Sequence, residues 1–145
     1  MARKKGKPPG QKTIVLYQEM VRSTPFKKLG GIAIVILMEF FCRRVMSEIK
    51  HPRRGSTWVV ANNGELVLTF REALQLGIAA SNFTRGIKRL IYYGFLDVTR
   101  PGIGGTGLHN QPTFYALSDR WKLWGTPGYL WAKKPTNSMA RVGNF

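Results

Sequence analysis

The apolar positions of the chain form one long block followed by shorter patterned segments. From Leu29 to about Ile49 they are nearly continuous, with a few charged interruptions, which predicts a mostly buried central helix. The pair Gly30-Gly31 leaves the start of this helix open. Upstream, segment 14–20 suits a short strand or a helical turn, and Ser23-Thr24-Pro25 predicts a cap with proline at the first helical position.

Two clusters of turn-forming residues follow the apolar block. They are segment 51–56 and Asn62-Asn63-Gly64, and they flank the apolar stretch 57–60. A second apolar stretch, 65–68, comes directly after the second cluster. Because Asn-Gly is the favoured two-residue hairpin turn, the pattern predicts a β-hairpin that pairs 57–60 with 65–68.

Two helices are predicted next. Thr69 and Glu72 have the spacing of a capping box, in which each side chain satisfies a free amide at the helix start. The first helix then covers 70–76 and ends at Gly77, a residue that adopts the left-handed conformation without steric cost. The second helix begins between Ala79 and Ser81 and continues to Tyr93, where Gly94 stops it.

The second helix is amphipathic at about 100° per residue. Phe83, Ile87, Leu90 and Ile91 fall on one arc, which predicts a face buried in the core. The opposite arc carries the polar and cationic residues Ser81, Asn82, Thr84, Arg85, Lys88, Arg89 and Tyr92. This second face is expected to point to solvent or to a partner.

Two strands, 95–100 and 113–117, are predicted to pair after this helix. The connection between them, 101–112, is too rich in glycine and proline for regular structure. Its glycines between 102 and 107 are spaced like a phosphate-binding loop, but such a loop needs a helix immediately after it. The pattern therefore favours an exposed wing over a nucleotide site.

Aromatic and basic residues alternate in segment 118–134, namely Trp121, Trp124, Tyr129 and Trp131 with Arg120, Lys122, Lys133 and Lys134. Aromatic rings interleaved with cations can stack on single-stranded bases. The favoured interpretation is a segment that docks on the domain or forms a dimer contact, which leaves a homodimer open. Residues 135–145 are expected to be a flexible tail.

Charge narrows the choice of partner. The chain has 23 Lys and Arg against 7 Asp and Glu, a net charge of +16, which strongly favours a polyanion. Residues 1–12 contain Arg3, Lys4, Lys5, Lys7 and Lys12 but no acid, and predict a disordered basic arm. No apolar stretch follows these charges, so the start does not resemble a secretion signal.

Catalysis, metal binding and membrane insertion receive no support. The acids show no paired spacing, and His51 and His109 fall in separate turns. Cys42 is the single cysteine, which excludes an internal disulfide and any Cys-x-x-Cys site, and its apolar surroundings predict a buried, inert thiol. The longest apolar run is shorter than the ~20 residues that span a bilayer. We expect a cytoplasmic protein that is not an enzyme and carries no metal or cofactor.

The order of these elements and the motifs within segment 68–98 resemble winged helix-turn-helix domains. The resemblance rests on the Gly77-Ile78 turn, on Phe83-Thr84-Arg85 and on Gly94-Phe95. Similar runs occur in transcription regulators and in phage or plasmid replication proteins. The resemblance covers about 29–117, although the family usually has serine or threonine where this chain has Ala79.

The resemblance implies an α+β winged-helix domain at 13–117, with a three-helix core and a β-hairpin wing. Helix 80–93 would lie in the DNA major groove, where Ser81, Asn82 and Arg85 would contact bases and Lys88 and Arg89 phosphates. The remaining candidate contacts are Thr84, Arg71, Arg100, His109 and the arm residues Arg3, Lys4, Lys5 and Lys7. The wing is expected to contact the backbone only.

Several alternatives stay open. The module serves both transcription regulation and DNA replication or maintenance, and in either role we expect duplex DNA as partner at the nucleoid. The charge suits RNA equally, so an RNA-binding or ribosome-associated protein is the main competitor. A structural adaptor that uses the helix face for protein contact is a third class.

Overall fold

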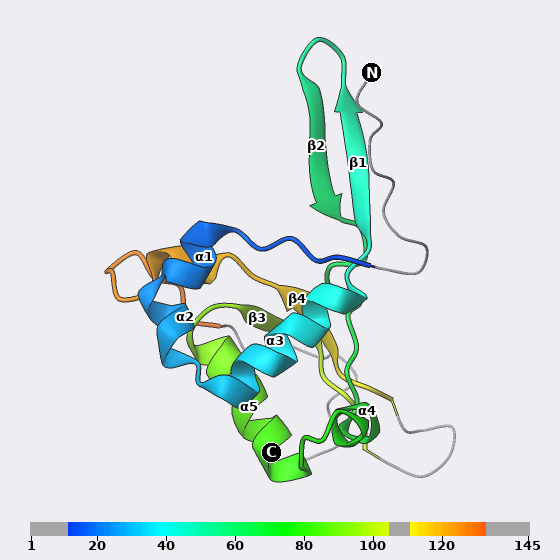
Figure 1. The fold of residues 1–145 in the computed structure, drawn as a ribbon, viewed down its shortest axis with the longest axis vertical. Coiled ribbons are helices and arrows are strands. Elements are labelled where there is room, and N and C mark those ends of the chain that lie inside the picture. The colour runs from blue at the N-terminus through cyan, green and yellow to red at the C-terminus, as the bar shows by residue number, and fades with distance from the viewer. Residues whose placement is uncertain (1–11, 105–110, 133–145) are drawn as a thin grey trace, which may run out of the picture.

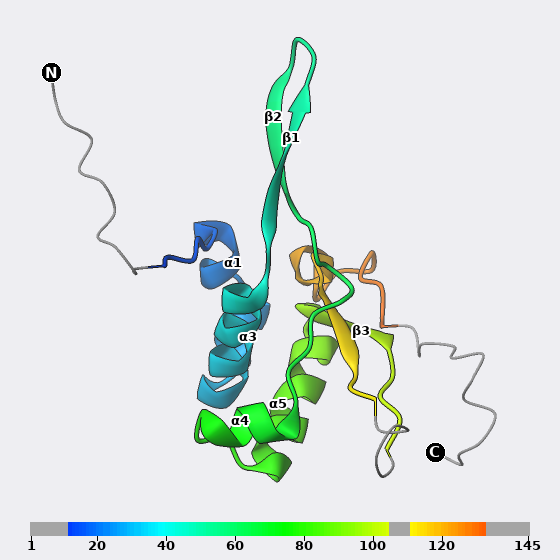
Figure 2. The same cartoon turned by 90° about the vertical axis from the view of Figure 1, so that its right-hand side faces the viewer.

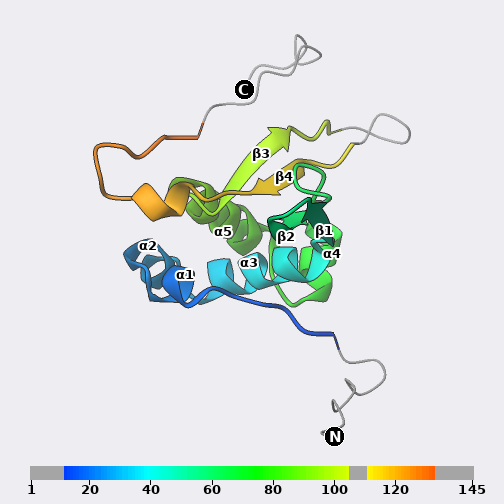
Figure 3. The ribbon, with the colours of Figure 1, turned by 90° about the horizontal axis from the view of Figure 1, so that it is seen from above.

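The computed structural model describes residues 12–104 and 111–132 and shows a mixed α+β fold. Helix α5 lies between helix α3 on one side and the β3–β4 hairpin on the other (Figures 1 and 3). A second hairpin, β1–β2, projects from this body (Figure 2). The elements are α1 (Gln18–Arg22), α2 (Thr24–Lys28), α3 (Gly31–Arg43), β1 (Met46–His51), β2 (Gly55–Val60), α4 (Phe70–Gln75), α5 (Ala80–Tyr92), β3 (Leu96–Arg100), β4 (Phe114–Leu117) and a short 3₁₀ helix, η2 (Arg120–Leu123).

The N-terminal helices follow the local signals closely. Segment 14–20 becomes helical from Gln18 and forms no strand. Ser23 caps α2, and its hydroxyl oxygen accepts a hydrogen bond from the Phe26 amide at 3.4 Å. The predicted cap is confirmed, with Pro25 as the second rather than the first residue of the helix.

Helix α3 ends at Arg43, well before the predicted end near Ile49. The apolar residues Met46 and Ile49 belong instead to the exposed strand β1. The side chain of Asn62 accepts a hydrogen bond from the Val45 amide at 2.8 Å and donates one to the Arg43 carbonyl at 3.0 Å. An asparagine distant in sequence therefore satisfies the backbone groups released at the helix end, which apolar periodicity cannot reveal.

The predicted pairing of 57–60 with 65–68 is wrong. Strand β2 pairs antiparallel with β1, in a register that aligns Met46 with Val60 and His51 with Gly55. The turn of this hairpin is formed by 51–54, where the Arg54 amide donates to the His51 carbonyl at 3.3 Å. Strand β1 gives β2 a six-residue partner, whereas in segment 65–68 only Leu66 forms a bridge, and its partner is Tyr115.

The cluster Asn62-Asn63-Gly64 is a junction rather than a hairpin turn. While Asn62 holds the end of α3, the side chain of Asn63 exchanges two hydrogen bonds with the backbone of Leu117, of 3.1 and 2.7 Å. The Thr99 hydroxyl donates to the Gly64 carbonyl. Both strands of the second hairpin are thus tied to the base of the first.

Leu66 forms a single antiparallel bridge with Tyr115, in which the two residues exchange hydrogen bonds of 3.1 and 2.7 Å. Tyr115 also pairs with Val98 of β3 on its other edge. The order across this part of the molecule is therefore Leu66, β4, β3. What remains of the predicted strand 65–68 is this one bridge.

The signals around α4 and α5 are confirmed. In the capping box the Glu72 amide donates to the Thr69 hydroxyl at 3.2 Å, and the Thr69 amide donates to the Glu72 carboxylate at 3.0 Å. Gly77 and Gly94 follow the two helices with φ of 82° and 85°. Phe83, Ile87 and Leu90 are buried and Ile91 is half-buried, which is the predicted core face of α5.

The core lies mainly between α3 and α5. Its fully buried large side chains are Phe40, Phe95, Leu29, Ile36, Leu37, Leu66, Leu90 and Leu96. Gly86 permits the close approach of the two helices, because a Cβ added there would lie 2.5 Å from the Ile36 Cδ1. Trp121 of η2 is also part of this core and stacks on Phe95 with ring centres 5.8 Å apart.

Two further observations concern single features of the described chain. Cys42 is exposed, so the expectation of a buried thiol is wrong. It lies in the last turn of α3. None of the helices in residues 12–104 and 111–132 has the length and apolar content needed to span a membrane.

Candidate nucleic-acid interface

Helix α5 presents a cationic face to solvent. Ser81, Thr84, Arg85 and Lys88 are all exposed, in agreement with the predicted polar arc. Their spacing of three and four residues places them along one side of the helix. These four side chains are the predicted site residues that the fold brings together on one surface.

This face contains no acid of its own, because none occurs between Ala73 and Leu96. The two acids that flank this stretch are held by internal ion pairs. Arg43 Nη1 lies 2.8 Å from the Glu72 carboxylate, and Arg120 Nη2 lies 2.6 Å from the Asp97 carboxylate. The hydrogen bond from the Thr69 backbone, together with Arg43, holds the pKa of Glu72 below its ordinary value. Neither Glu72 nor Asp97 is therefore free to offset the positive charge of α5.

The start of α5 has no side-chain cap. Ala79 is the N-cap residue, and its methyl side chain offers no hydroxyl to the first-turn amides. Helix N-termini attract anions because their free amides and the helix dipole both favour negative charge. Ser81 lies in the first turn of α5, and the exposed cations Arg85 and Lys88 follow further along the helix.

Two of the predicted contacts have other roles in the fold. The Arg89 guanidinium donates to the carbonyls of Lys28 and Leu29, at 3.4 and 3.1 Å, and so caps the end of α2. Asn82 is half-buried in a shallow groove that also includes Arg85, Arg89 and residues 29–33 at the start of α3. Arg89 is nevertheless exposed, like Arg85, whereas Asn82 is only partly accessible.

The other predicted residues lie apart from α5 or outside the described chain. Arg71 is exposed on α4, and the Arg100 guanidinium carbon lies 4.0 Å above the centre of the Phe114 ring. His109 falls outside the described residues, as do Arg3, Lys4, Lys5 and Lys7. Among residues 12–104 and 111–132, only Arg43 and Arg120 form ion pairs with carboxylates, so Arg71, Arg85, Lys88 and Arg100 keep their charges available.

The β3–β4 hairpin extends further than the sequence suggested. Ile103 and Gln111 exchange two backbone hydrogen bonds, each of 2.9 Å. The Gly102 amide also donates to the Thr113 hydroxyl at 2.9 Å. Paired backbone therefore continues beyond both strands into a segment that we expected to be irregular, and only 105–110 lie outside the described residues.

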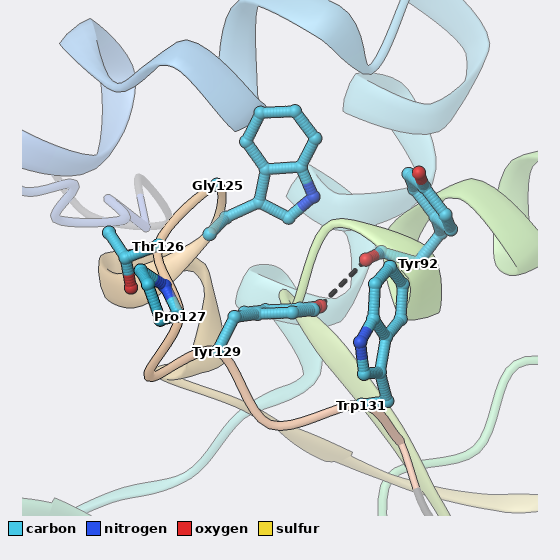
Figure 4. A pocket seen from close by; sticks show the side chains of 7 residues that line it. Tyr92, Gly125, Thr126, Pro127, Tyr129 and Trp131 are labelled. Carbon is cyan, nitrogen blue, oxygen red and sulfur yellow. Dashed lines mark hydrogen bonds between the residues drawn. The ribbon is translucent and has the colours of Figure 1, made fainter.

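The aromatic segment after β4 packs around Arg120, a role that the sequence pattern did not reveal. The guanidinium donates to Asp97, to the Tyr129 hydroxyl at 2.8 Å, and to the carbonyls of Ile91, Leu96 and Leu130. The Tyr129 hydroxyl donates to the Tyr92 carbonyl at 2.6 Å, at the end of α5 (Figure 4). Burial raises the pKa of Tyr129 above its ordinary value. This packing favours docking over single-strand stacking for Trp121 and Tyr129.

An open hollow of about 390 Å³ lies beside this network (Figure 4). Its walls are the rings of Tyr92, Trp124, Tyr129 and Trp131 and the turn 125–127. Trp131 is largely exposed and contacts both tyrosine rings. Among the described residues, no charged side chain lines the hollow, so this part of the chain offers no group that would orient a charged ligand there.

Comparison with protein-family models, with curated proteins and with solved structures gave no significant match. Within the described part of the chain, no three His, Cys, Asp or Glu side chains are grouped so that they could hold a metal ion.

Proposed function

We propose that the protein is a winged helix-turn-helix protein that binds duplex DNA through α5. The order α3, Leu66 bridge, α4, α5, β3, β4 supports the proposal, because a short strand before the second helix that joins the wing hairpin is a feature of this fold family. On that basis α5 is the recognition helix, and the extended β3–β4 hairpin is the wing.

The observation that carries the proposal is the exposed face of α5, which contains no acid. The acids that flank it in sequence, Glu72 and Asp97, form ion pairs with Arg43 and Arg120. Arg85 and Lys88 are exposed on this face and form no ion pair with the described carboxylates. Phosphates are the ligands for which such a surface is electrostatically complementary. Within this surface, Ser81, Thr84 and Arg85 have side chains that can read base edges, and Lys88 has one that suits phosphate.

The structure-based roles differ for the remaining candidates. We propose that Asn82 contributes from the flank of α5 and that Arg89 acts mainly by fixing α2 against α5. Arg71 and Arg100 would contact the DNA backbone on either side of the helix. Regulation, replication or maintenance of DNA at the nucleoid are the biological roles that this activity would serve, and catalysis is not part of the proposal.

The test is a titration of the full chain against duplex DNA, single-stranded DNA and duplex RNA at two salt concentrations. Binding to duplex DNA should be tightest and should weaken steeply with salt, because counterions are released from phosphates. Tightest binding to duplex RNA would instead support the RNA-binding alternative. Binding to none of the three would leave only the adaptor interpretation.

Variants of α5 then separate base reading from charge. After selection of a preferred site from a random duplex library, Arg85→Ala should cost about 1–3 kcal/mol on that site and relax its sequence preference. Lys88→Ala should weaken preferred and random duplexes equally. Arg22→Ala, which removes an exposed charge from α1, is the matched control. If Arg85→Ala kept the full sequence preference, α5 would not be the reading helix.

A further inference from the structure

The β1–β2 hairpin stands away from the rest of the molecule. Every residue from Met46 to Trp58 is exposed, and the two strands project from the end of the body opposite α4 (Figures 1 and 2). An isolated two-stranded hairpin is only marginally stable in water, and within the described residues neither of its strands pairs with a third strand. A projecting element of this kind is typical of a surface that a partner covers.

The base of the hairpin is fixed to the body. The Ala61 amide donates to the Val45 carbonyl at 2.7 Å, which continues the strand pairing to the end of α3. The side-chain oxygen and nitrogen of Asn62 also form hydrogen bonds here, with the Val45 amide and the Arg43 carbonyl. The hairpin therefore leaves the body in a defined direction, and its tip is held away from α5.

The tip is cationic. Lys50, Arg53 and Arg54 lie within the six residues 50–55, together with His51 and with no acid. Glu48 is the one acid of the hairpin, and it faces Trp58 across the strands. A second copy of this chain would bring the same cations to such a contact, whereas a nucleic acid brings phosphates.

Arg53 is the one described residue other than glycine with a positive φ, 67°. It follows Pro52 in a turn that is closed by a hydrogen bond from the Arg54 amide to the His51 carbonyl. In a type II turn this third position is normally glycine or asparagine. A long cationic side chain is thus present where the backbone disfavours it. Strain of this kind is typical of functional positions.

We propose that the β1–β2 hairpin is a second duplex-binding element, which places its basic tip against DNA while α5 engages another duplex segment. The major groove of B-DNA is wide enough for a two-stranded ribbon. Trp58, which is 60% exposed on the same face of the hairpin as Lys50, supplies an apolar contact beside the charges. The inference rests on the proposed binding of DNA by α5 and adds a bridging activity to it.

The test is a capture experiment with two duplexes. One duplex is immobilised, the full-length protein is bound to it, and retention of a second, labelled duplex is measured. The doubly substituted variant Arg53→Gly, Arg54→Gln removes two charges and places glycine at the strained position, so it leaves the turn at least as favourable. It should reduce capture of the second duplex about fivefold or more, with first-duplex binding reduced less than about twofold.

Two control variants make the result specific. Arg53→Lys keeps the charge and should retain capture. Arg22→Gln, Lys27→Gln removes two exposed charges from α1 and α2 and should capture the second duplex as well as wild type does. Equal loss in this control would mean that net charge alone is responsible, and the proposal would fail.

The outcomes distinguish the two proposals. If the wild-type protein binds no duplex, both fail. If Arg85→Ala, Lys88→Ala loses first-duplex binding while the hairpin variant captures as well as wild type, only the bridging proposal fails. If sedimentation shows a wild-type dimer that the hairpin variant dissociates, the hairpin is a contact between copies of this chain, and the proposal is overturned.

Discussion

Gly94 and Trp121 are in direct backbone contact. The Trp121 amide donates to the Gly94 carbonyl at 3.1 Å, and a Cβ added to Gly94 would lie 2.5 Å from the Trp121 nitrogen. The residue that ends α5 is therefore also the residue on which the C-terminal segment packs. The orientation of the proposed recognition helix and the packing of the aromatic segment depend on the same glycine.

Gly94→Ala should destabilise the protein more than Gly77→Ala. Both glycines have a positive φ, which costs an alanine about 1–2 kcal/mol. A Cβ at Gly77 meets open space, whereas at Gly94 it meets backbone atoms of Arg120 and Trp121. Denaturant unfolding should give a loss of about 3 kcal/mol or more for Gly94→Ala. Equal losses would show that the backbone contact contributes nothing.

Phe83→Ala should cost roughly 3–5 kcal/mol, because it empties a large buried site between α4 and α5. The Phe83 ring is 3% exposed and makes an edge contact with Phe70 at 5.1 Å. Ser81→Ala, on the exposed face, should be nearly neutral for folding. Thermal melts of the two variants compare the faces directly. A large loss of stability for Ser81→Ala with a small loss for Phe83→Ala would show that the buried and exposed faces of α5 are assigned the wrong way round.

Arg120→Ala should cost about 3 kcal/mol, because it leaves the Asp97 carboxylate and several carbonyls without their donor. Only 14% of the Arg120 side chain is exposed. Arg120→Lys should recover little of this loss, since one ammonium group cannot reach acceptors on β3, α5 and the C-terminal segment together. The fluorescence of Trp121 and Trp124 would report the release of the segment. Full stability of Arg120→Lys would contradict the role of the planar guanidinium.

Glu72 should make the free energy of unfolding depend on pH in the acidic range. Its pKa is lowered in the folded protein by the Thr69 backbone hydrogen bond and by Arg43. The unfolded state therefore binds the proton first, so the stabilisation is complete above the ordinary glutamate pKa of about 4.3 and is lost as the pH falls through the lower folded value. Glu72→Gln removes the charge but keeps a side-chain oxygen that can accept the Thr69 amide hydrogen bond of the capping box.

Comparing wild type with Glu72→Gln at several pH values tests whether the charge of Glu72 causes this pH dependence. Wild type should be more stable than Glu72→Gln at pH 7, and the difference should disappear under acidic conditions as Glu72 becomes protonated. Urea unfolding at several pH values between 3 and 7 would measure it. A difference that persisted unchanged at the lowest pH would show that the charge of Glu72 is not the cause.

Features that depend on neighbouring residues are predictable from the sequence. The Ser23 cap, the Thr69 and Glu72 capping box, and the glycines that end α4 and α5 were all predictable, because each is a contact over three or four positions. The two faces of α5 followed from helical periodicity for the same reason. The position of the cations on one exposed face of α5 is therefore predictable from the sequence.

Features that depend on distant partners become visible only in the folded chain. The pairing of β2 with β1, the end of α3 at Arg43 and the junction formed by Asn62 and Asn63 all rest on hydrogen bonds between residues far apart in sequence. The role of Arg89 as a cap for α2 joins positions about 60 residues apart. Local propensity gives several competing answers at such sites, and the contact that buries or satisfies most groups in three dimensions selects one of them.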